Sequence, residues 1–186
     1  MNNMSMQAGS GRTYRYLTTK PTYRFGYGLS YTRFALSALT TVPALGDDDE
    51  VCAAREPGAT SLARVCGNLS NVGARSSGAV VLMYIQPEEL SKPFRLMPTK
   101  QLYDFSRFNL IAEGESVEVC STICDTDTSF VDPSDGARHV LAGTYSVVFD
   151  NGQEQEATQS IELTVESKLA RVVQTVPVMP GNNIPY

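Results

Sequence analysis

The chain has 186 residues, which suits one domain with segments to spare, since domains commonly run to roughly 100–150 residues. Hydrophobic residues make up 42% of it, and the formal net charge is −5 at pH 7. The basic residues are scattered, so the composition argues against nucleic-acid binding, which needs a basic patch. The sequence contains no apolar run of about 18 residues, and therefore predicts no transmembrane helix.

Strand-like segments follow one another along most of the chain. The expected strands are Phe34–Val42, Ser61–Asn71, Ala79–Ile85, a short pair within Leu102–Leu110, Ser116–Cys120, Thr144–Phe149 and Ser160–Val165. The dipeptide Asn151-Gly152 is a hairpin signal, because both residues tolerate positive φ. No segment shows the pattern of an amphipathic helix, and the surplus length falls in two loops, Gly46–Pro57 and Pro87–Thr99. This pattern predicts an all-β fold, an immunoglobulin- or fibronectin type III-like antiparallel sandwich.

Two terminal segments do not fit the sandwich. We expect an extended N-terminal arm, the sandwich and a C-terminal extension, over residues 1–31, 32–166 and 167–186. The extension carries β-branched residues at Val172, Val173 and Val176. Such residues favour a strand that adds to a sheet edge, either of this chain or of a partner, so we interpret them as a contact segment.

The arm concentrates aromatic side chains. They are Tyr14, Tyr16, Tyr23, Phe25, Tyr27 and Tyr31, with arginines interleaved. Gly26 and Gly28 predict a tightly bent backbone between them. Aromatic rings stack on sugars and on bases, but aromatic and Arg residues are also enriched at the centres of protein interfaces. We favour the protein interface, since large apolar patches usually mark one.

Four cysteines occur, at Cys52, Cys66, Cys120 and Cys124, together with a single histidine, His139. A structural zinc site typically needs four Cys or His ligands, and no Cys-x-x-Cys pair is present, so we expect no metal and favour two disulfides over four thiols. Four cysteines allow three connectivities, and the sequence does not choose among them. Asn68 begins an Asn-Leu-Ser glycosylation sequon.

The remaining polar motifs favour structural roles. The run Asp47-Asp48-Asp49-Glu50 lacks the spaced ligands and glycine of a calcium loop, so a solvated acidic loop is expected. His139 has no cysteine or acid beside it in the sequence and is expected to be structural. We identify no catalytic residue.

Several motifs, in order, resemble the fibronectin type III-like domain that closes family-3 glycoside hydrolases. The aromatic stretch Phe25–Thr32 is similar to the opening signature of that domain, and Asn71-Val72-Gly73 to its Asn-x-Gly turn. Lys100-Gln101-Leu102 and Ala142-Gly143-Thr144-Tyr145 are similar to later sections. The resemblance runs from Gly11 to Val165. The cysteines incline it toward the β-xylosidase-like branch.

The resemblance implies a relative of these hydrolases that lacks their catalytic residues. In the family, the nucleophile and the acid/base lie in preceding domains, so neither is carried over to a residue here. We therefore expect a non-catalytic accessory subunit that contacts other proteins and takes no cofactor. One alternative is the C-terminal stabilising domain of a secreted β-xylosidase- or β-glucosidase-like enzyme, bound to its catalytic domains. A second is a carbohydrate-binding module with weak sugar contact.

The compartment depends on which alternative holds. Residues Met1 to Gly9 are polar and lack the apolar core of a signal peptide. A hydrolase domain would be extracellular, whereas an accessory subunit would lie within a larger complex.

Overall fold

The computed structural model describes residues 5–43, 46–90, 97–132, 134–153 and 158–174. Its main body is a sandwich of two four-stranded antiparallel sheets, which confirms the predicted fold class. The first sheet contains β1 (Phe34–Leu36), β2 (Thr40–Val42), β3 (Ser61–Asn71) and β6 (Ser116–Cys124). In it β3 pairs with β1 and β2 along one edge and with β6 along the other.

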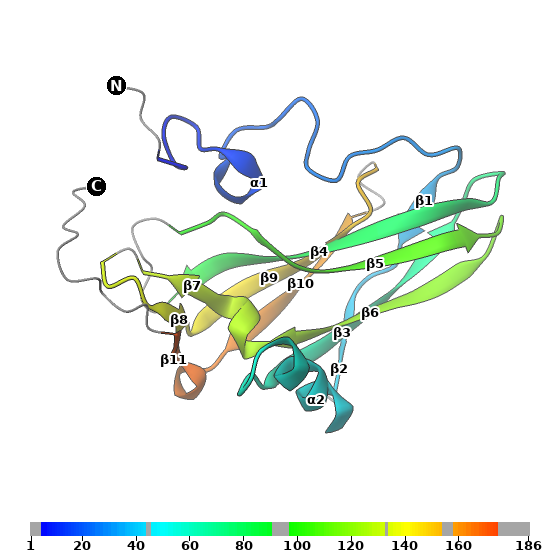
Figure 1. Ribbon diagram of the computed structural model, residues 1–186. Coiled ribbons are helices and arrows are strands. Elements are labelled where there is room, and N and C mark those ends of the chain that lie inside the picture. Colours follow the sequence, from blue (N-terminus) through cyan, green and yellow to red (C-terminus); the bar gives the residue numbers. More distant parts are fainter. Residues whose placement is uncertain (1–4, 44–45, 91–96, 133, 154–157, 175–186) are drawn as a thin grey trace.

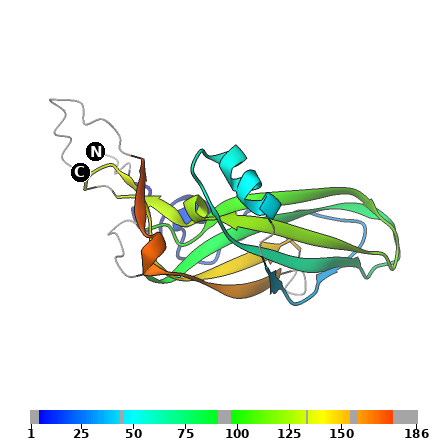
Figure 2. The ribbon, with the colours of Figure 1, turned by 90° about the horizontal axis from the view of Figure 1, so that it is seen from below.

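The second sheet has the strand order β10-β9-β4-β5. Its strands are β4 (Ser77–Leu90), β5 (Gln101–Ile111), β9 (Gly143–Asp150) and β10 (Thr158–Val165). A small third sheet of β7 (Ser129–Val131), β8 (Arg138–Val140) and β11 (Arg171–Gln174) lies at one end of the sandwich (Figure 2). Strand β11 supplies the edge strand expected from the valine-rich segment, and it pairs with this chain's own β8.

The core lies between the two large sheets. Val81, Met83 and Ile85 of β4 are fully buried, because alternate residues of a strand point to the same face. Val147 and Phe149 of β9 lie beside them in the same cluster. Other members come from the opposite sheet, namely Val65, Leu69, Val119 and Ile123. The even-numbered residues of β4 therefore point away from the core, toward the outer face of the second sheet.

The expectation of a loop over Gly46–Pro57 is wrong, because this segment forms the helix α2 (Gly46–Arg55). Three aspartates in its first turn interact favourably with the positive end of the helix dipole. Only Asp48 and Cys52, one turn apart, are buried on it. The helix is therefore held by polar contacts and a disulfide rather than by an apolar stripe. The sequence of this segment therefore has no amphipathic pattern, and the helix was not predicted.

Three strand boundaries also differ from the sequence-based expectation. Strand β4 continues past Pro87 to Leu90, with a register shift between Pro87 and Glu89 against β9. Irregularities of this kind accommodate proline within a sheet. The segment expected as a short strand pair is the single strand β5, and Phe34–Val42 divides into β1 and β2. The loop between Asp150 and Thr158 is too long for a two-residue Asn-Gly turn.

The arm and α2 lie on opposite sides of the sandwich (Figure 1). The arm, which includes the one-turn α1 (Thr13–Tyr16), runs along the outer face of the second sheet. Helix α2 packs on β3 and β6 of the first sheet. The described helices include none long and apolar enough to cross a membrane.

Candidate docking surface

The start of the arm is attached to the beginning of β5. The guanidinium of Arg15 donates from Nη2 to Oε1 of Gln101 at 2.7 Å. The carbonyl oxygen of Arg15 accepts from the backbone N–H of Thr99 at 2.6 Å and from its hydroxyl at 2.9 Å. The N–H of Leu102 donates to the hydroxyl of Tyr14 at 3.4 Å. Backbone and side chain together therefore fix this part of the arm.

An aromatic stack joins the arm to β4. The rings of Tyr14 and Phe25 are stacked with centroids 4.5 Å apart, and Tyr14 lies 5.9 Å from Tyr84 in a tilted arrangement. Such pairs stabilise contacts beyond the area that they bury. The ammonium of Lys100 lies 4.5 Å from the centre of the Tyr84 ring. Burial raises the pKa of Tyr84 and lowers that of Lys100, so both charged forms are disfavoured here.

Arg24 provides the ionic attachment of the arm. Its Nη2 lies 3.2 Å from Oδ1 of Asp150, whose side chain is only 7% exposed. Its Nη1 donates to the hydroxyl of Thr158 at 3.3 Å, and Nη2 also donates to the carbonyl of Gln153. Because Asp150 is nearly buried, the arginine supplies the countercharge that a buried carboxylate requires.

Two glycines allow the arm to lie close to the sandwich. Gly26 has φ +85°, and a Cβ at this position would lie 2.3 Å from Cδ1 of Leu82 on β4. A Cβ at Gly152 would lie 2.0 Å from the carbonyl oxygen of Gly26. By contrast, Gly28 has no positive φ and open space where a Cβ would be. The expected bend therefore depends on Gly26, and Gly152 is needed opposite it.

The outer side of the arm presents large apolar side chains to solvent. We call this surface the arm ridge. Its members and their exposed fractions are Tyr23 70%, Phe25 47%, Tyr27 46%, Leu29 92% and Tyr31 89%. Tyr23 and Tyr27 contact one another, with ring centroids 5.1 Å apart. Several exposed large apolar side chains on one short segment are typical of an interaction surface.

The structure divides the six aromatics singled out in the sequence. Tyr14 faces the chain's own sheet, and Tyr16 is half-buried with the Arg15 guanidinium 5.9 Å from its ring. The other four belong to the arm ridge, so their assignment to an interface with another protein stays a prediction. Leu29 is the most exposed member and was not singled out, because a lone leucine among aromatics gives no distinctive pattern.

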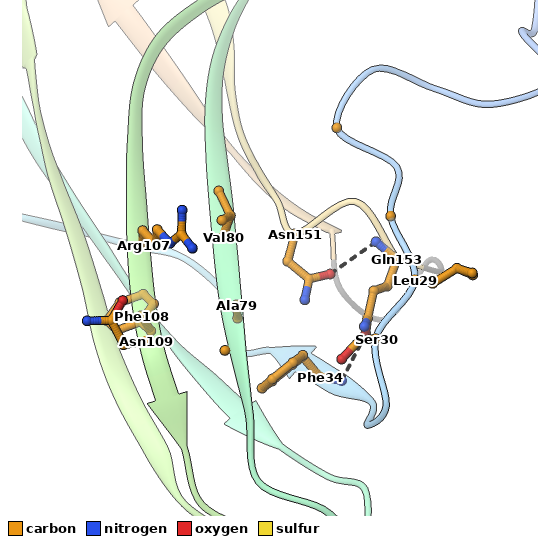
Figure 3. A pocket seen from close by; sticks show the side chains of 13 residues that line it. Leu29, Ser30, Phe34, Ala79, Val80, Arg107, Phe108, Asn109, Asn151 and Gln153 are labelled. Atoms are coloured by element: carbon orange, nitrogen blue, oxygen red, sulfur yellow. Dashed lines mark hydrogen bonds between the residues drawn. The ribbon is translucent and has the colours of Figure 1, made fainter.

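A groove of about 410 Å³ separates the arm from β4 and β5 (Figure 3). The arm from Gly26 to Ser30 forms one wall, and Val80 lies in the floor. Arg107 of β5 and Asn151 of the β9–β10 loop face the groove from opposite sides of Val80. Sequence reasoning did not find this groove, since its residues come from four separate segments.

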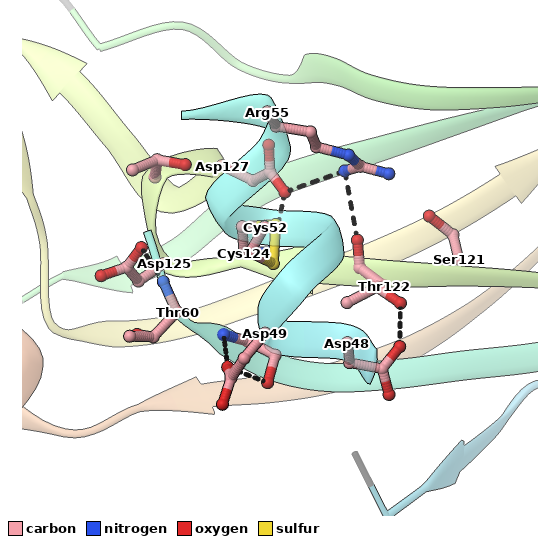
Figure 4. The surroundings of a disulfide bond; sticks show 12 residues. Asp48, Asp49, Cys52, Arg55, Thr60, Ser121, Thr122, Cys124, Asp125 and Asp127 are labelled. Carbon is pink, nitrogen blue, oxygen red and sulfur yellow. Dashed lines mark hydrogen bonds and ion pairs between the residues drawn. A yellow bond between two sulfur atoms is a disulfide. The ribbon is translucent and has the colours of Figure 1, made fainter. Parts of the chain in front are cut away.

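On the opposite face, α2 is anchored by the disulfide Cys52–Cys124 (Figure 4). Asp48 is 1% exposed, accepts from the Thr122 hydroxyl and lies 3.2 Å from Nη1 of Arg64. The acidic run is therefore not simply solvated, as the sequence had suggested. The second disulfide joins Cys66 of β3 to Cys120 of β6, so two disulfides are present as predicted.

A second polar cluster connects the end of α2 to the sandwich. Arg55 lies 3.0 Å from Oδ2 of Asp104 and 3.6 Å from Oδ2 of Asp127. Burial raises the pKa of Asp127 to about 6, although an N–H from Cys124 and the Arg55 charge oppose the rise. The cluster thus holds a carboxyl group that titrates at mildly acidic pH.

Among the residues that the structure describes, two groups of side chains meet the distance condition for metal ligands. The first group contains Cys66, Glu118 and Cys120. Cys66 and Cys120 share a disulfide, so neither has a thiolate that could bind a metal ion. In the second, His139 lies 3.0 Å from Asp135, close to Asp132. Asp132 accepts two hydrogen bonds from Ser134, which lower its pKa and explain its position by local turn geometry.

The other predicted contact residues lie in separate places. Asn68 is exposed on β3, so its sequon is sterically open, and glycosylation there stays a prediction. Val172 is 51% exposed on β11, and Val173 beside it is half-buried. Val176 lies outside the described residues. In Figure 1, β11 lies at the other end of the molecule from β1.

Comparison with known proteins identifies this architecture. Residues 79–153 match the sequence model of the fibronectin type III-like domain. The chain carries the fibronectin type III-like domain of family-3 glycoside hydrolases. A probable exo-1,4-β-xylosidase of Aspergillus japonicus is 30% identical over 165 residues, which cover 84% of this chain and 20% of the relative.

β-Glucosidases match at a similar level. A probable β-glucosidase D of Emericella nidulans is 31% identical over 147 residues, 71% of this chain and 17% of the relative. The solved structure of β-glucosidase 3B from Thermotoga neapolitana in complex with α-D-glucose has 26% identity and a TM-score of 0.62, covering 82% of this chain and 18% of that one. The chain thus spans about one fifth of the length of these relatives. Xylosidases and glucosidases match equally well, so the β-xylosidase-like assignment stays a prediction.

Proposed function

We propose that this domain is a non-catalytic docking module, which braces the catalytic domains of a family-3 glycoside hydrolase through the arm ridge. The observation that carries the proposal is the arrangement of the arm. Arg24, Gly26 and Tyr14 fix the arm to the sandwich, while five large apolar side chains of the arm keep 46–92% of their surface exposed. A surface that is already ordered loses little conformational entropy on binding, which favours its use as an interface.

The buried carboxylates support a structural rather than a catalytic role. Glycoside hydrolysis ordinarily uses two facing carboxyl groups beside the scissile bond. Among the described residues, three acids are buried, and each lies within ion-pair distance of an arginine. The pairs are Asp48–Arg64 at 3.2 Å, Asp125–Arg171 at 2.6 Å and Asp150–Arg24 at 3.2 Å. Each pair joins two segments of this fold, as a structural ion pair does.

An oxidising compartment fits the same proposal. Both disulfides link strands or a helix of the main body, and such bonds persist chiefly outside the cytosol. One relative, a periplasmic β-glucosidase of Salmonella typhimurium, is 35% identical over 91 residues. We therefore propose an extracytoplasmic location, in association with a hydrolase.

The test is a domain replacement in the A. japonicus relative. The full 186-residue chain replaces the matched segment, and a deletion of that segment serves as the baseline. We expect the chimera to recover soluble enzyme and resistance to thermal inactivation. The triple substitution Tyr23→Ser/Leu29→Ser/Tyr31→Ser should return both properties toward the deletion, because it removes the apolar contact area without touching the core.

A matched control separates the arm ridge from general surface polarity. Val51, Leu110 and Val131 are 41%, 67% and 58% exposed on other elements. Their triple change to serine should leave the chimera unaffected. Equal behaviour of the two triple variants, or a chimera no better than the deletion, would contradict the proposal.

A further inference from the structure

The floor of the groove beneath the arm is an ordered face of two paired strands. Val80 pairs with Arg107, and Leu82 pairs with Phe105, so all four side chains point to the outer face of the sheet. Gly26 covers Leu82, whereas Val80 is 39% exposed and lines the groove together with the half-buried Phe108. The floor therefore offers an apolar surface with a guanidinium beside it (Figure 3).

Polar groups without partners line this floor. Arg107 and Asn109 occupy alternate positions of β5 and are exposed, and their side chains make no hydrogen bond or ion pair within the described part of the chain. Asn151 accepts from the N–H of Gln153 at 3.2 Å, which leaves its amide Nδ2 free to donate. No Asp or Glu lines the groove among the described residues. The site is thus rich in planar donors and holds no anionic group.

The other wall limits what fits. The arm from Gly26 to Ser30 contributes mainly backbone, since the Leu29 side chain points away from β4 and β5 (Figure 3), and Gly28 leaves open space there. A volume of about 410 Å³ lies within the usual range for small-molecule sites, roughly 300–1,000 Å³. Because Val80 and Arg107 in its floor are exposed, the groove is open rather than closed over a ligand.

We propose that this groove binds a saccharide chain. A pyranose ring has an apolar face of C–H groups, which suits Val80 and the half-buried ring of Phe108. It also has neighbouring hydroxyls at its edge, which suit the donors of Arg107 and Asn151. An open groove admits internal units of a chain, and its few polar contacts imply a dissociation constant on the order of 0.1–1 mM. The groove is distinct from the arm ridge, because its floor is the outer face of the second sheet rather than the exposed side chains of the arm.

The test uses the full chain in nuclear magnetic resonance titrations with two probes, unsubstituted xylohexaose and a xylo-oligosaccharide carrying glucuronic acid. We expect shifts of amide signals in β4, β5 and residues 26–30. Equal affinity for both probes identifies neutral sugar units as the ligand, and preference for the acidic probe identifies the uronic carboxylate as the partner of Arg107. Either result supports the proposal.

Variants make the result specific. Arg107→Ala should weaken binding about tenfold, the effect of one charge-assisted hydrogen bond. Arg75→Ala, an exposed arginine of the β3–β4 loop, and Tyr23→Ala of the arm ridge should change it less than about twofold. No shift with either probe, or shifts that Arg107→Ala leaves unchanged, would overturn the proposal. If Arg107→Ala instead impairs the chimera described above, the groove belongs to the protein interface, which would also overturn it.

Discussion

Asp150, near the end of β9, and Arg24, in the middle of the arm, form an ion pair of 3.2 Å across 126 residues of sequence. The carboxylate also accepts from the N–H of Gly152 at 2.7 Å and from the Thr158 hydroxyl at 3.2 Å. One buried acid thus organises both the β9–β10 loop and the arm. The arm is therefore part of the folded domain, and its outer side is a preformed surface rather than a loose tether.

Replacement of Arg24 by alanine tests this attachment. The change leaves Asp150 nearly buried without its countercharge, so we expect the free energy of unfolding to fall by about 1–3 kcal/mol, less than for a fully buried pair because Arg24 is 33% exposed. Urea denaturation followed by circular dichroism measures this, since the chain has no tryptophan. Lys168→Ala, which breaks an exposed pair with Glu166, is the control and should leave the free energy of unfolding almost unchanged, because solvent screens such a pair. Equal effects of the two substitutions would refute the attachment.

Gly26 tests the close approach of the arm to the sheet. Gly26→Ala places a methyl group 2.3 Å from Leu82, in addition to the cost of positive φ. Gly114 also has positive φ, +72°, but has open space around it. Gly114→Ala should therefore cost about 1–2 kcal/mol, and Gly26→Ala distinctly more, with faster proteolysis of the arm. Similar losses in both variants would show that the arm does not lie on Leu82.

The Cys52–Cys124 disulfide is expected to hold α2 on the first sheet. It closes a separation of 72 residues, so its removal by Cys52→Ala/Cys124→Ala should lower the free energy of unfolding by about 4 kcal/mol. The Cys66–Cys120 bond, with a separation of 54, should contribute a similar amount by chain entropy. Only the first double variant should expose residues 46–57 to limited proteolysis. Cleavage there in both variants, or in neither, would contradict the role assigned to this disulfide.

The raised pKa of Asp127 predicts that the stability of the fold depends on pH. Its pKa is about 6 in the folded chain, above the ordinary value of 3.8, because burial outweighs the charges of Arg55 and Arg138 and is assisted by Asp104. The folded state therefore binds this proton more tightly than the unfolded state does. The resulting stabilisation is fully present below about pH 4 and is lost as the pH rises through about 6.

Asp127→Asn isolates that effect. We expect the variant to be more stable than the parent chain at pH 7.5, by about 2–3 kcal/mol, with the difference shrinking toward pH 4. Urea denaturation across this pH range measures it. A difference that stays constant with pH would show that Asp127 titrates normally.

The sequence predicted the strands well wherever apolar residues alternate or cluster, as in Ser61–Asn71, whose bounds match β3. It did not reveal α2, whose attachment depends on Cys52 and buried polar pairs rather than on hydrophobic periodicity. It predicted the aromatic arm, but not which of its side chains face the sheet and which face solvent. Whether Tyr14 or Tyr31 faces the sheet depends on the path of the backbone, and that path is set by contacts with Leu82 and Asp150, distant in the chain.

The central claim is that the arm ridge is covered by another domain. Hydroxyl-radical footprinting tests it most directly, since modification of a side chain reports its exposure. The chain alone should be modified strongly at Tyr23, Leu29 and Tyr31, which are 70%, 92% and 89% exposed. In the active chimera these three residues should be protected several-fold, while Leu110 and Val131, which are 67% and 58% exposed, are modified as before. Unchanged modification of the three ridge residues in an active, thermally resistant chimera would contradict the account.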